Sequence, residues 1–249
     1  MCARSWDSKT MDKPRGFTLT EVLVSLTVFS FVVLAAMECF TTARSHFLDM
    51  KNKHQTSQAI LSAMDKIRAD VLPSGKGLII PIRLGLVKGI RCGEGILHIQ
   101  ISDQEFQSIS PLVSGQTRIS FHKTSFLKKK RKLCIYDQNK GEVKDILSVD
   151  SKSCVISSPL SYSYDKDEAC IALLRELMFY LDEKKDVFRR KVNSSPAQPL
   201  LEDASLFECS YDETRYLVRV TICLKDKKES KHEMFLFSKN SALAGCISP

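Results

Sequence analysis

The chain has 249 residues, of which 43% are hydrophobic and 27% charged, with 37 Lys and Arg against 29 Asp and Glu. Its mean hydropathy of −0.12 excludes a protein with many membrane spans but leaves room for one membrane segment. These values also exclude wholesale disorder, and the 10 glycines and 8 prolines exclude a collagen-like fibre. The net charge of +8 suits nucleic acid, anionic lipid or acidic proteins as partners and selects none of them.

An apolar segment begins close to the N-terminus. No formally charged residue occurs from Val22 to Met37. As a helix, the stretch from Phe17 to Met37 would measure about 31 Å, which matches the hydrocarbon core of a bilayer, about 30 Å thick. Residues 1–16 before it contain more Lys and Arg than Asp, which keeps this side cytoplasmic. The sequence therefore predicts one transmembrane helix, with the rest of the chain exported.

A single carboxylate interrupts the apolar pattern. Glu21 lies near the start of the segment, and an ionised side chain costs about 2.5–3.5 kcal/mol at mid-bilayer and less near the interface. If the chain were cut after Gly16, the new amine of Phe17 would lie about 6 Å away along a helix. That amine, or the amine of a neighbouring copy, would neutralise Glu21 where the dielectric constant is low.

The residues from Lys13 to Val22, KPRGFTLTEV, resemble the cleavage and methylation motif of type IV prepilins and type II secretion pseudopilins. The shared elements are a basic leader, a Gly, a Phe, a Glu at the fifth mature position and an apolar helix. The resemblance implies that a prepilin peptidase cuts between Gly16 and Phe17 and methylates the Phe17 amine. It also implies that Glu21 supplies the charge pairing for assembly.

Two other targeting signals share the basic and apolar parts of this pattern. A secretory signal peptide would need small residues in an A-x-A-like arrangement, and the sequence Ala35-Ala36-Met37-Glu38 lacks it. A plain, uncleaved signal anchor would have no use for Glu21. The prepilin-like interpretation is therefore favoured over both.

The helical pattern continues beyond the apolar segment. Apolar residues recur at spacings of three, four and seven from Phe40 to Val71, and Pro73 ends the run. One helix from about Phe17 to Val71 is predicted, its first half in lipid and its second half with an apolar stripe that a soluble fold must cover. Two helices with a kink at 52–57, where the residues are mostly polar, are the alternative.

Short strands are expected after residue 75, so the predicted fold class is α+β and pilin-like, a long N-terminal helix packed on antiparallel β-sheets. The expected strands are 77–86, 96–101, 117–122, 132–136, 206–211, 216–224 and 233–238, whereas 168–180 fits a helix or strands and 193–198 is a loop. The predicted domains are a removed leader (1–16), a transmembrane part of the helix (17–39), a periplasmic part (40–72) and a β-rich periplasmic domain (73–249).

A second resemblance lies in the C-terminal half. The stretches 176–182, 187–190, 199–201, 206–212 and 217–222 are similar to the J-type minor pseudopilin. This implies a structural subunit, not an enzyme, in the periplasmic pseudopilus of a type II secretion system, at its tip complex. The implied partners are major and minor pseudopilins, the prepilin peptidase and an inner-membrane assembly platform, with no cofactor and no nucleic acid.

Alternatives of other classes stay open. A minor pilin of a type IV pilus or competence system would have the same N-terminus. A membrane-anchored periplasmic binding module would keep residues 1–16. An exported hydrolase would need Ser125 or Ser163, each three residues before a Lys, to meet a His and an acid in a pocket.

Several local patterns point to no specific chemistry. The basic run from Lys128 to Lys132 is interpreted as a solvated hairpin loop, with contact to anionic headgroups or an acidic subunit as its functional alternative. The five histidines have no zinc-site spacing, and the acidic loop 165–168 lacks the glycine and distal glutamate of an EF-hand, so no metal is expected.

The cysteines raise the question of disulfides. Cys2 would leave with the leader, and Cys39 lies at the membrane edge. An oxidising compartment favours disulfides among the rest, and burial as small hydrophobic residues is the alternative. Possible disulfide cysteines, with pairing unassigned, are Cys92, Cys134, Cys154, Cys170, Cys209, Cys223 and Cys246.

Overall fold

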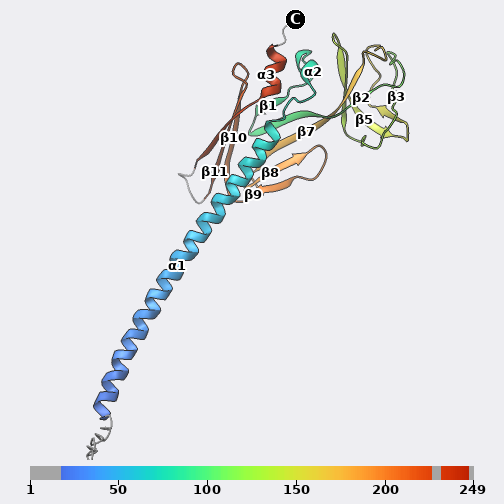
Figure 1. Ribbon diagram of the computed structural model, residues 1–249. Coiled ribbons are helices and arrows are strands. Elements are labelled where there is room, and N and C mark those ends of the chain that lie inside the picture. Colours follow the sequence, from blue (N-terminus) through green and yellow to red (C-terminus); the bar gives the residue numbers. More distant parts are fainter. Residues whose placement is uncertain (1–17, 226–230, 247–249) are drawn as a thin grey trace, which may run out of the picture. The chain divides into compact units, whose positions relative to one another are not determined.

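The computed structural model describes residues 18–225 and 231–246. The chain divides into two compact units, Met1–Ser57 and Gln58–Pro249, which we call the N-terminal unit and the C-terminal unit. Helix α1 (Leu19–Val71) belongs to both units, since it supplies the described part of the first and the opening segment of the second. Figure 1 shows the ribbon and labels many of the elements, which are numbered in chain order.

Helix α1 is one continuous element of 53 residues, with helical backbone through residues 52–57. Within the C-terminal unit its buried residues recur every three or four positions, at Ile60, Ala63, Met64, Ile67 and Val71. This stripe matches the helical period that the sequence predicted. The earlier apolar positions behave differently, because Phe40, Phe47 and Met50 are all more than 60% exposed. The expectation that a soluble fold covers the whole stripe is therefore wrong for residues 40–50.

Antiparallel sheets fill the C-terminal unit, so the α+β class with a long N-terminal helix is confirmed. In the described residues one sheet has nine strands and the other three. The larger sheet contains β1 (Ile90–Gly93), β2 (Ile96–Gln107), β3 (Arg118–Ser120), β4 (Lys132–Tyr136), β5 (Gly141–Val149), β6 (Ser153–Ile156), β7 (Cys170–Asp182), β8 (Val187–Val192) and β9 (Gln198–Leu201). The smaller sheet contains β10 (Ala204–Asp212), β11 (Leu217–Leu224) and β12 (His232–Phe237).

Strand β7 organises the larger sheet. Along one edge it pairs with β2 from Cys170 to Tyr180. Along the other edge its first half pairs with β4 and its second half with β8. The sequence left 168–180 open between helix and strand because residues 171–174 are buried on both faces and show no alternation. A strand that is covered on both sides has this continuous apolar pattern.

The main core joins the end of α1 to both sheets. Ile67 and Val71 of α1 belong to one buried cluster with Leu97 and Phe179 of the larger sheet and Val220 of the smaller one. Two further clusters lie within the larger sheet, one around β3–β6 and one where α2 (Ile79–Arg83) meets β4 and β7. The apolar stripe at the end of α1 is therefore a part of the folded core.

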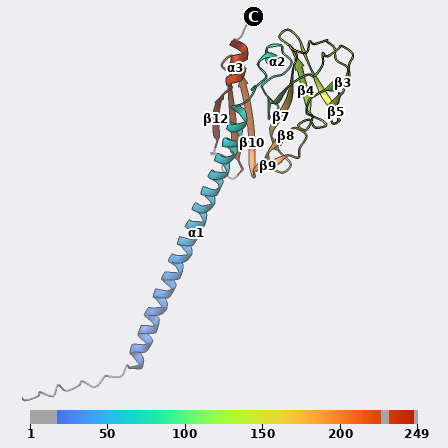
Figure 2. The same cartoon turned by 45° about the vertical axis from the view of Figure 1, so that its right-hand side comes forward.

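Most predicted strands are present, with boundaries moved by a few residues. The strand expected over 77–86 is wrong, because α2 and its turns occupy that segment. Pro81 fits the first turn of α2, where its missing N–H is not needed, and Gly75 and Gly77 have positive φ. Strands β1, β5, β6 and β9 and helix α3 (Lys239–Cys246) were not predicted. Helix α3 lies beside α2 (Figures 1 and 2).

Candidate functional site

The start of α1 is fixed by a reciprocal pair of hydrogen bonds. The backbone N–H of Thr18 donates to Oε2 of Glu21 at 3.0 Å, and the N–H of Glu21 donates to Oγ1 of Thr18 at 3.4 Å. The Thr18 hydroxyl also donates to Oε2 of Glu21, at 3.0 Å. This is a capping box, in which an N-cap threonine and a glutamate three residues later satisfy two free N–H groups. It holds the Glu21 carboxylate against the residue that follows Phe17.

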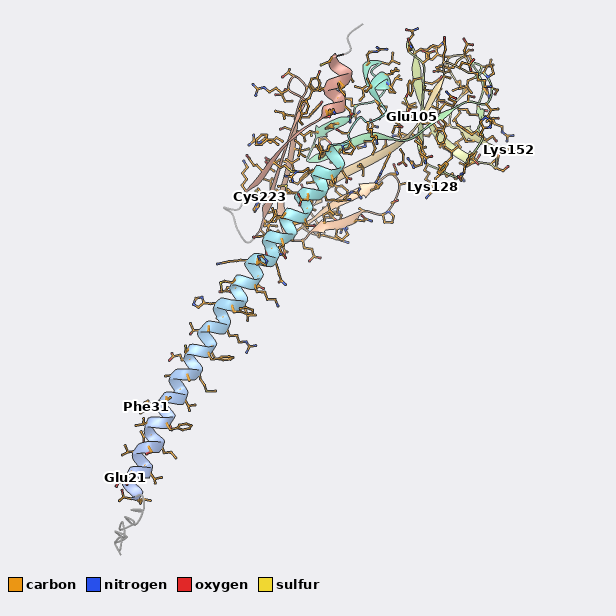
Figure 3. The ribbon with its side chains drawn as sticks, in the orientation of Figure 1. Glu21, Phe31, Glu105, Lys128, Lys152 and Cys223 are labelled. Carbon is orange, nitrogen blue, oxygen red and sulfur yellow. The ribbon has the colours of Figure 1, made fainter. Side chains whose placement is uncertain are left out.

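An apolar surface follows the capping box and covers the whole circumference of the helix. Consecutive large side chains are exposed, including Phe29 at 67% and Phe31 at 68%, and Figure 3 labels Phe31 together with Glu21. The helix passes the length and composition criteria for a membrane span, with a mean hydropathy of 2.2 in its best window. A helix that is apolar on all sides needs lipid or other helices around it.

The polar side chains of this apolar stretch bond within the helix itself. The hydroxyl of Thr27 donates to the carbonyl of Leu23 at 2.8 Å, and that of Ser30 donates to the carbonyl of Leu26 at 2.7 Å. Such bonds leave no hydroxyl hydrogen in need of water, which a bilayer core does not provide. The segment is therefore suited to a water-free environment.

A family model describes this segment. Residues 11–37 match the prokaryotic N-terminal methylation motif, which is typical of type IV prepilin-like proteins, pseudopilins included. The chain carries a prepilin-like N-terminus. The motif implies processing by a prepilin peptidase and assembly with other pilins. Gly16 and Phe17, the predicted cleavage and methylation residues, lie outside the described residues, and their roles and that of Glu21 stay predictions.

Other comparisons add little about this prepilin-like chain. No curated protein sequence matches it significantly. Two solved structures match, the tailspike gp61 of Pseudomonas phage phi297 and the tailspike gp49 of Pseudomonas phage LKA1. They are 15% and 20% identical over 30% of this chain and 14% of theirs, with TM-scores of 0.26 and 0.27. The chain thus spans a small part of their length, and this similarity supports no argument about function.

The basic run from Lys128 to Lys132 is exposed at its first three residues and paired at its last two. Lys128, Lys129 and Lys130 are exposed, as the solvated-loop interpretation predicted, and Figure 3 labels Lys128. That interpretation is wrong for Arg131, which is buried, pairs with Asp103 at 3.0 Å and donates two hydrogen bonds to the carbonyl of Leu174. Lys132 pairs with Glu176 at 2.9 Å. The end of the run therefore holds the larger sheet together.

Among described residues, no group of three or more His, Cys, Asp or Glu side chains is placed to hold a metal. A cavity of about 440 Å³ lies between α2, the β10–β11 turn and α3, and no histidine is among its lining residues. Its exposed acid, Glu213, pairs with Lys88 at 3.1 Å. The hydroxyl of Ser163 accepts from the backbone N–H of Ser114, at 3.0 Å.

The predicted disulfide cysteines are all placed in the C-terminal unit. The described cysteines are all thiols. Cys134 and Cys154 are buried, and burial raises the pKa of these thiols to about 12 and about 11. Cys92 and Cys209 lie on different sheets, on strands β1 and β10 that contact each other, and both pack against the main core. Cys170, Cys223 and Cys246 lie on β7, β11 and α3.

Two features of the site were missed in the sequence. The first is the capping box, whose signal is the spacing Thr-x-x-Glu directly before an apolar run, present as Thr18-Leu19-Thr20-Glu21. The second is the pairing of Cys92 with Cys209, for which the sequence holds no signal because the two strands meet only in the tertiary fold.

Proposed function

We propose that this prepilin-like protein is a minor pseudopilin, a structural subunit of the periplasmic pseudopilus of a type II secretion system and not an enzyme. The observation that carries the proposal is an all-round apolar helix whose first turn holds Glu21 in a capping box. The methylation motif at residues 11–37 supports the same assignment. The protein would be anchored in the inner membrane by this helix, with its C-terminal unit in the periplasm.

The physical step in this function is a change of surroundings for the helix. Exposed side chains such as Leu26, Phe29 and Phe31 are covered by acyl chains before assembly and by the helices of other subunits afterwards. Both environments are apolar, so the transfer avoids the cost of exposing the helix to water. In a packed bundle Glu21 needs a cation, and the amine of Phe17 supplies it on the same or a neighbouring subunit.

Mass spectrometry of the mature N-terminus tests processing. In cells with an active prepilin peptidase, we expect the protein to begin at Phe17 and to carry one N-methyl group. In cells that lack the peptidase, the chain should still begin at Met1. A chain that retains Met1 in both strains would contradict the proposal and favour an uncleaved, anchored binding module.

A pair of variants separates charge from capping at Glu21. Glu21→Gln removes the charge but keeps a side chain that caps well at this position. Thr18→Ala removes the capping hydroxyl but keeps the charge. We expect cross-linking of the protein into pseudopili to fall at least tenfold in Glu21→Gln and to change little in Thr18→Ala. An equal loss in both variants would show that helix capping, not charge pairing, is what assembly requires.

The kind of filament is tested in the cell. Deletion of the gene should abolish export of type II secretion substrates and leave surface pili and DNA uptake intact. Loss of pili or of DNA uptake with normal secretion would instead identify a minor pilin of a type IV pilus or competence system. Complementation with the wild-type gene and with Glu21→Gln links the phenotype to the helix.

A further inference from the structure

Two cysteines from different sheets meet beside the main core of the C-terminal unit. Cys92 lies on β1 and Cys209 on β10, two strands that contact each other, and both side chains are partly buried against that core. The S–H of Cys209 donates to the carbonyl oxygen of Ile96, which is the strand partner of Gly93, the residue after Cys92. Each thiol is also the largest influence on the pKa of the other. The two side chains are therefore neighbours, although the residues are 117 positions apart (209 − 92).

Backbone groups at the end of the β1–β2 hairpin lie beside Cys209. Its S–H donates to the carbonyl oxygen of Ile96 at 3.2 Å, and the N–H of Gly93 is one of the groups that lower its pKa. The hydrogen bond from Cys92 is the main cause that lowers the pKa of Cys209, against the opposing effect of burial. The same bond, together with burial, raises the pKa of Cys92.

Thiol–disulfide exchange requires an attacking thiolate and a second thiol close to it. The thiolate is the attacking form of cysteine, and a lowered pKa makes Cys209 the nucleophile of the pair. Cys92 keeps its proton until the second step and lies within reach of the Cys209 sulfur. A nucleophile with an adjacent resolving thiol is the arrangement in which a dithiol is oxidised to an intramolecular disulfide.

We propose that Cys92 and Cys209 form a disulfide that joins β1 of the nine-stranded sheet to β10 of the three-stranded sheet. The oxidant is an external disulfide. The Cys209 thiolate attacks one of its sulfur atoms and releases the other as a thiolate. Cys92 then loses its proton, attacks Sγ of Cys209 and releases the second thiolate. In total the two cysteines lose two electrons and two protons, and the external disulfide becomes two thiols.

The position of the bond gives it a structural consequence. The main core that Cys92 and Cys209 flank includes Ile67 and Val71 of α1. A bond between the two sheets therefore closes a long loop around the residues that hold the end of the helix. Closing a long loop restricts the unfolded chain strongly, so the oxidised protein should be the more stable form.

The other buried cysteines do not share these surroundings. Cys134 belongs to the apolar cluster beneath α2, and Cys154 belongs to the cluster around β3–β6. Burial is the cause of the raised pKa at both thiols, which disfavours the reactive thiolate. These two residues act as small hydrophobic side chains. The proposal thus gives a disulfide role to Cys92 and Cys209 and a packing role to Cys134 and Cys154.

Peptide mapping of the purified full-length chain in detergent tests the pairing. The protein is incubated with oxidised glutathione, its remaining thiols are alkylated under denaturing conditions, and it is digested with trypsin. Residues 92–118 and 192–215 each form one tryptic peptide with a single cysteine. We expect these two peptides to be joined by a disulfide, and to separate after reduction. We also expect Tm to rise by about 5–10 °C on oxidation.

Matched variants decide the outcome. Cys92→Ser and Cys209→Ser should each abolish the joined peptide and the rise in Tm. Cys223→Ser, on β11 of the smaller sheet (Figure 3), should change neither. Alkylation of both Cys92 and Cys209 after oxidation, or their attachment to other cysteines in a correctly folded protein, would overturn the proposal. Because glutathione oxidation in vitro needs no export, failure here leaves the proposed secretion function untouched.

Discussion

Apolar side chains have opposite surroundings in the two units of this protein. In the N-terminal unit Leu26, Phe29 and Phe31 are 63–68% exposed, whereas Ile67 and Phe179 of the C-terminal unit are fully buried. Both sets are large and apolar, so residue type does not explain the difference. The C-terminal unit supplies its own cover from two sheets, and the N-terminal unit takes its cover from outside the chain. The C-terminal unit folds around its own core, and the N-terminal unit has the length and apolar surface of a membrane-spanning helix.

Polar groups follow a common rule in the two units. Among the described residues, no buried side-chain nitrogen or oxygen lacks a hydrogen-bond partner. In the C-terminal unit the partners come from distant parts of the chain, as in the pair of Asp70 and Arg190. In the N-terminal unit Thr27 and Ser30 bond to the preceding helical turn. These two hydroxyl groups therefore have hydrogen-bond partners without any water.

The largest expected effect concerns the ion pair that fixes the end of α1. Asp70 and Arg190 are both buried, and Oδ2 of Asp70 lies 2.5 Å from Nε of Arg190. Arg190→Ala leaves a buried, unpaired carboxylate, and we expect the free energy of unfolding to fall by about 3–5 kcal/mol. This free energy is measured by urea denaturation of the full chain in detergent, with far-UV circular dichroism as the signal.

Two further variants sharpen this test. Asp65→Ala breaks the exposed pair of Asp65 with Arg68 on the same helix and should change stability by less than about 0.5 kcal/mol. The double variant Asp70→Leu with Arg190→Met removes both charges and should recover much of the loss. The free energy of unfolding of Arg190→Ala could instead fall by less than about 1 kcal/mol, which is about one third of the smallest expected loss. That result would show that the pair of Asp70 and Arg190 is not buried in solution.

The second prediction compares two positions on one helix. Ile67 is fully buried and Leu61 is 64% exposed, although both lie in the C-terminal unit. Ile67→Ala should lower the free energy of unfolding by about 3 kcal/mol, because it creates a cavity in the main core. Leu61→Ala should have little effect, within about 0.5 kcal/mol. Equal losses of stability at both positions would mean that α1 packs against the sheets through a different face.

The third prediction concerns the apolar part of α1. Phe29→Asp places a carboxylate in the middle of the segment, and we expect membrane insertion to become less favourable by about 3 kcal/mol. Phe47→Asp lies beyond the segment and serves as the control with the same chemical change. The apparent insertion free energy in microsomes measures both. An equal penalty at Phe47 would place the membrane segment further along the helix than the sequence predicts.

Much of this contrast could be predicted from the sequence, because it depends on local patterns. The apolar run, the helical stripe at Ile60, Met64 and Ile67, and the alternation in β11 each follow from the period of one element. The strand expected over 77–86 failed because its apolar residues lack a decisive period. Pro81 and the positive φ of Gly77 then favoured a short helix with turns.

Features that join distant segments were beyond prediction from the sequence. Arg131 belongs to a run of basic residues that favours a solvated loop, yet it is buried because Asp103 and the carbonyl of Leu174 meet it in the fold. The pairing of Cys92 with Cys209 depends in the same way on the contact of β1 with β10. Spacing along the chain carries no information about either contact.

The smallest expected effect is on the pH dependence of the stability of the C-terminal unit. Burial alone would raise the pKa of Glu142, but the ion pair with Lys144 and the N–H groups of Ser161 and Tyr162 bring it below 4.5. Between the pKa of Glu142 in the folded protein and its higher pKa in the unfolded chain, the unfolded chain binds a proton and the folded protein does not. The stability that ionised Glu142 contributes is therefore present above pH 4.5 and is lost as the pH falls through the pKa of Glu142 in the folded protein.

Glu142→Gln isolates this contribution. The free energy of unfolding, measured from pH 7 to pH 3, should fall less steeply below pH 4.5 in the variant than in the wild type, because one proton uptake is removed. The slope is the readout, since loss of the partner of Lys144 lowers stability at every pH. Glu202→Gln, at an exposed position, is the matched control and should leave the slope unchanged. Equal slopes in wild type and Glu142→Gln would mean that Glu142 is solvated in the folded protein.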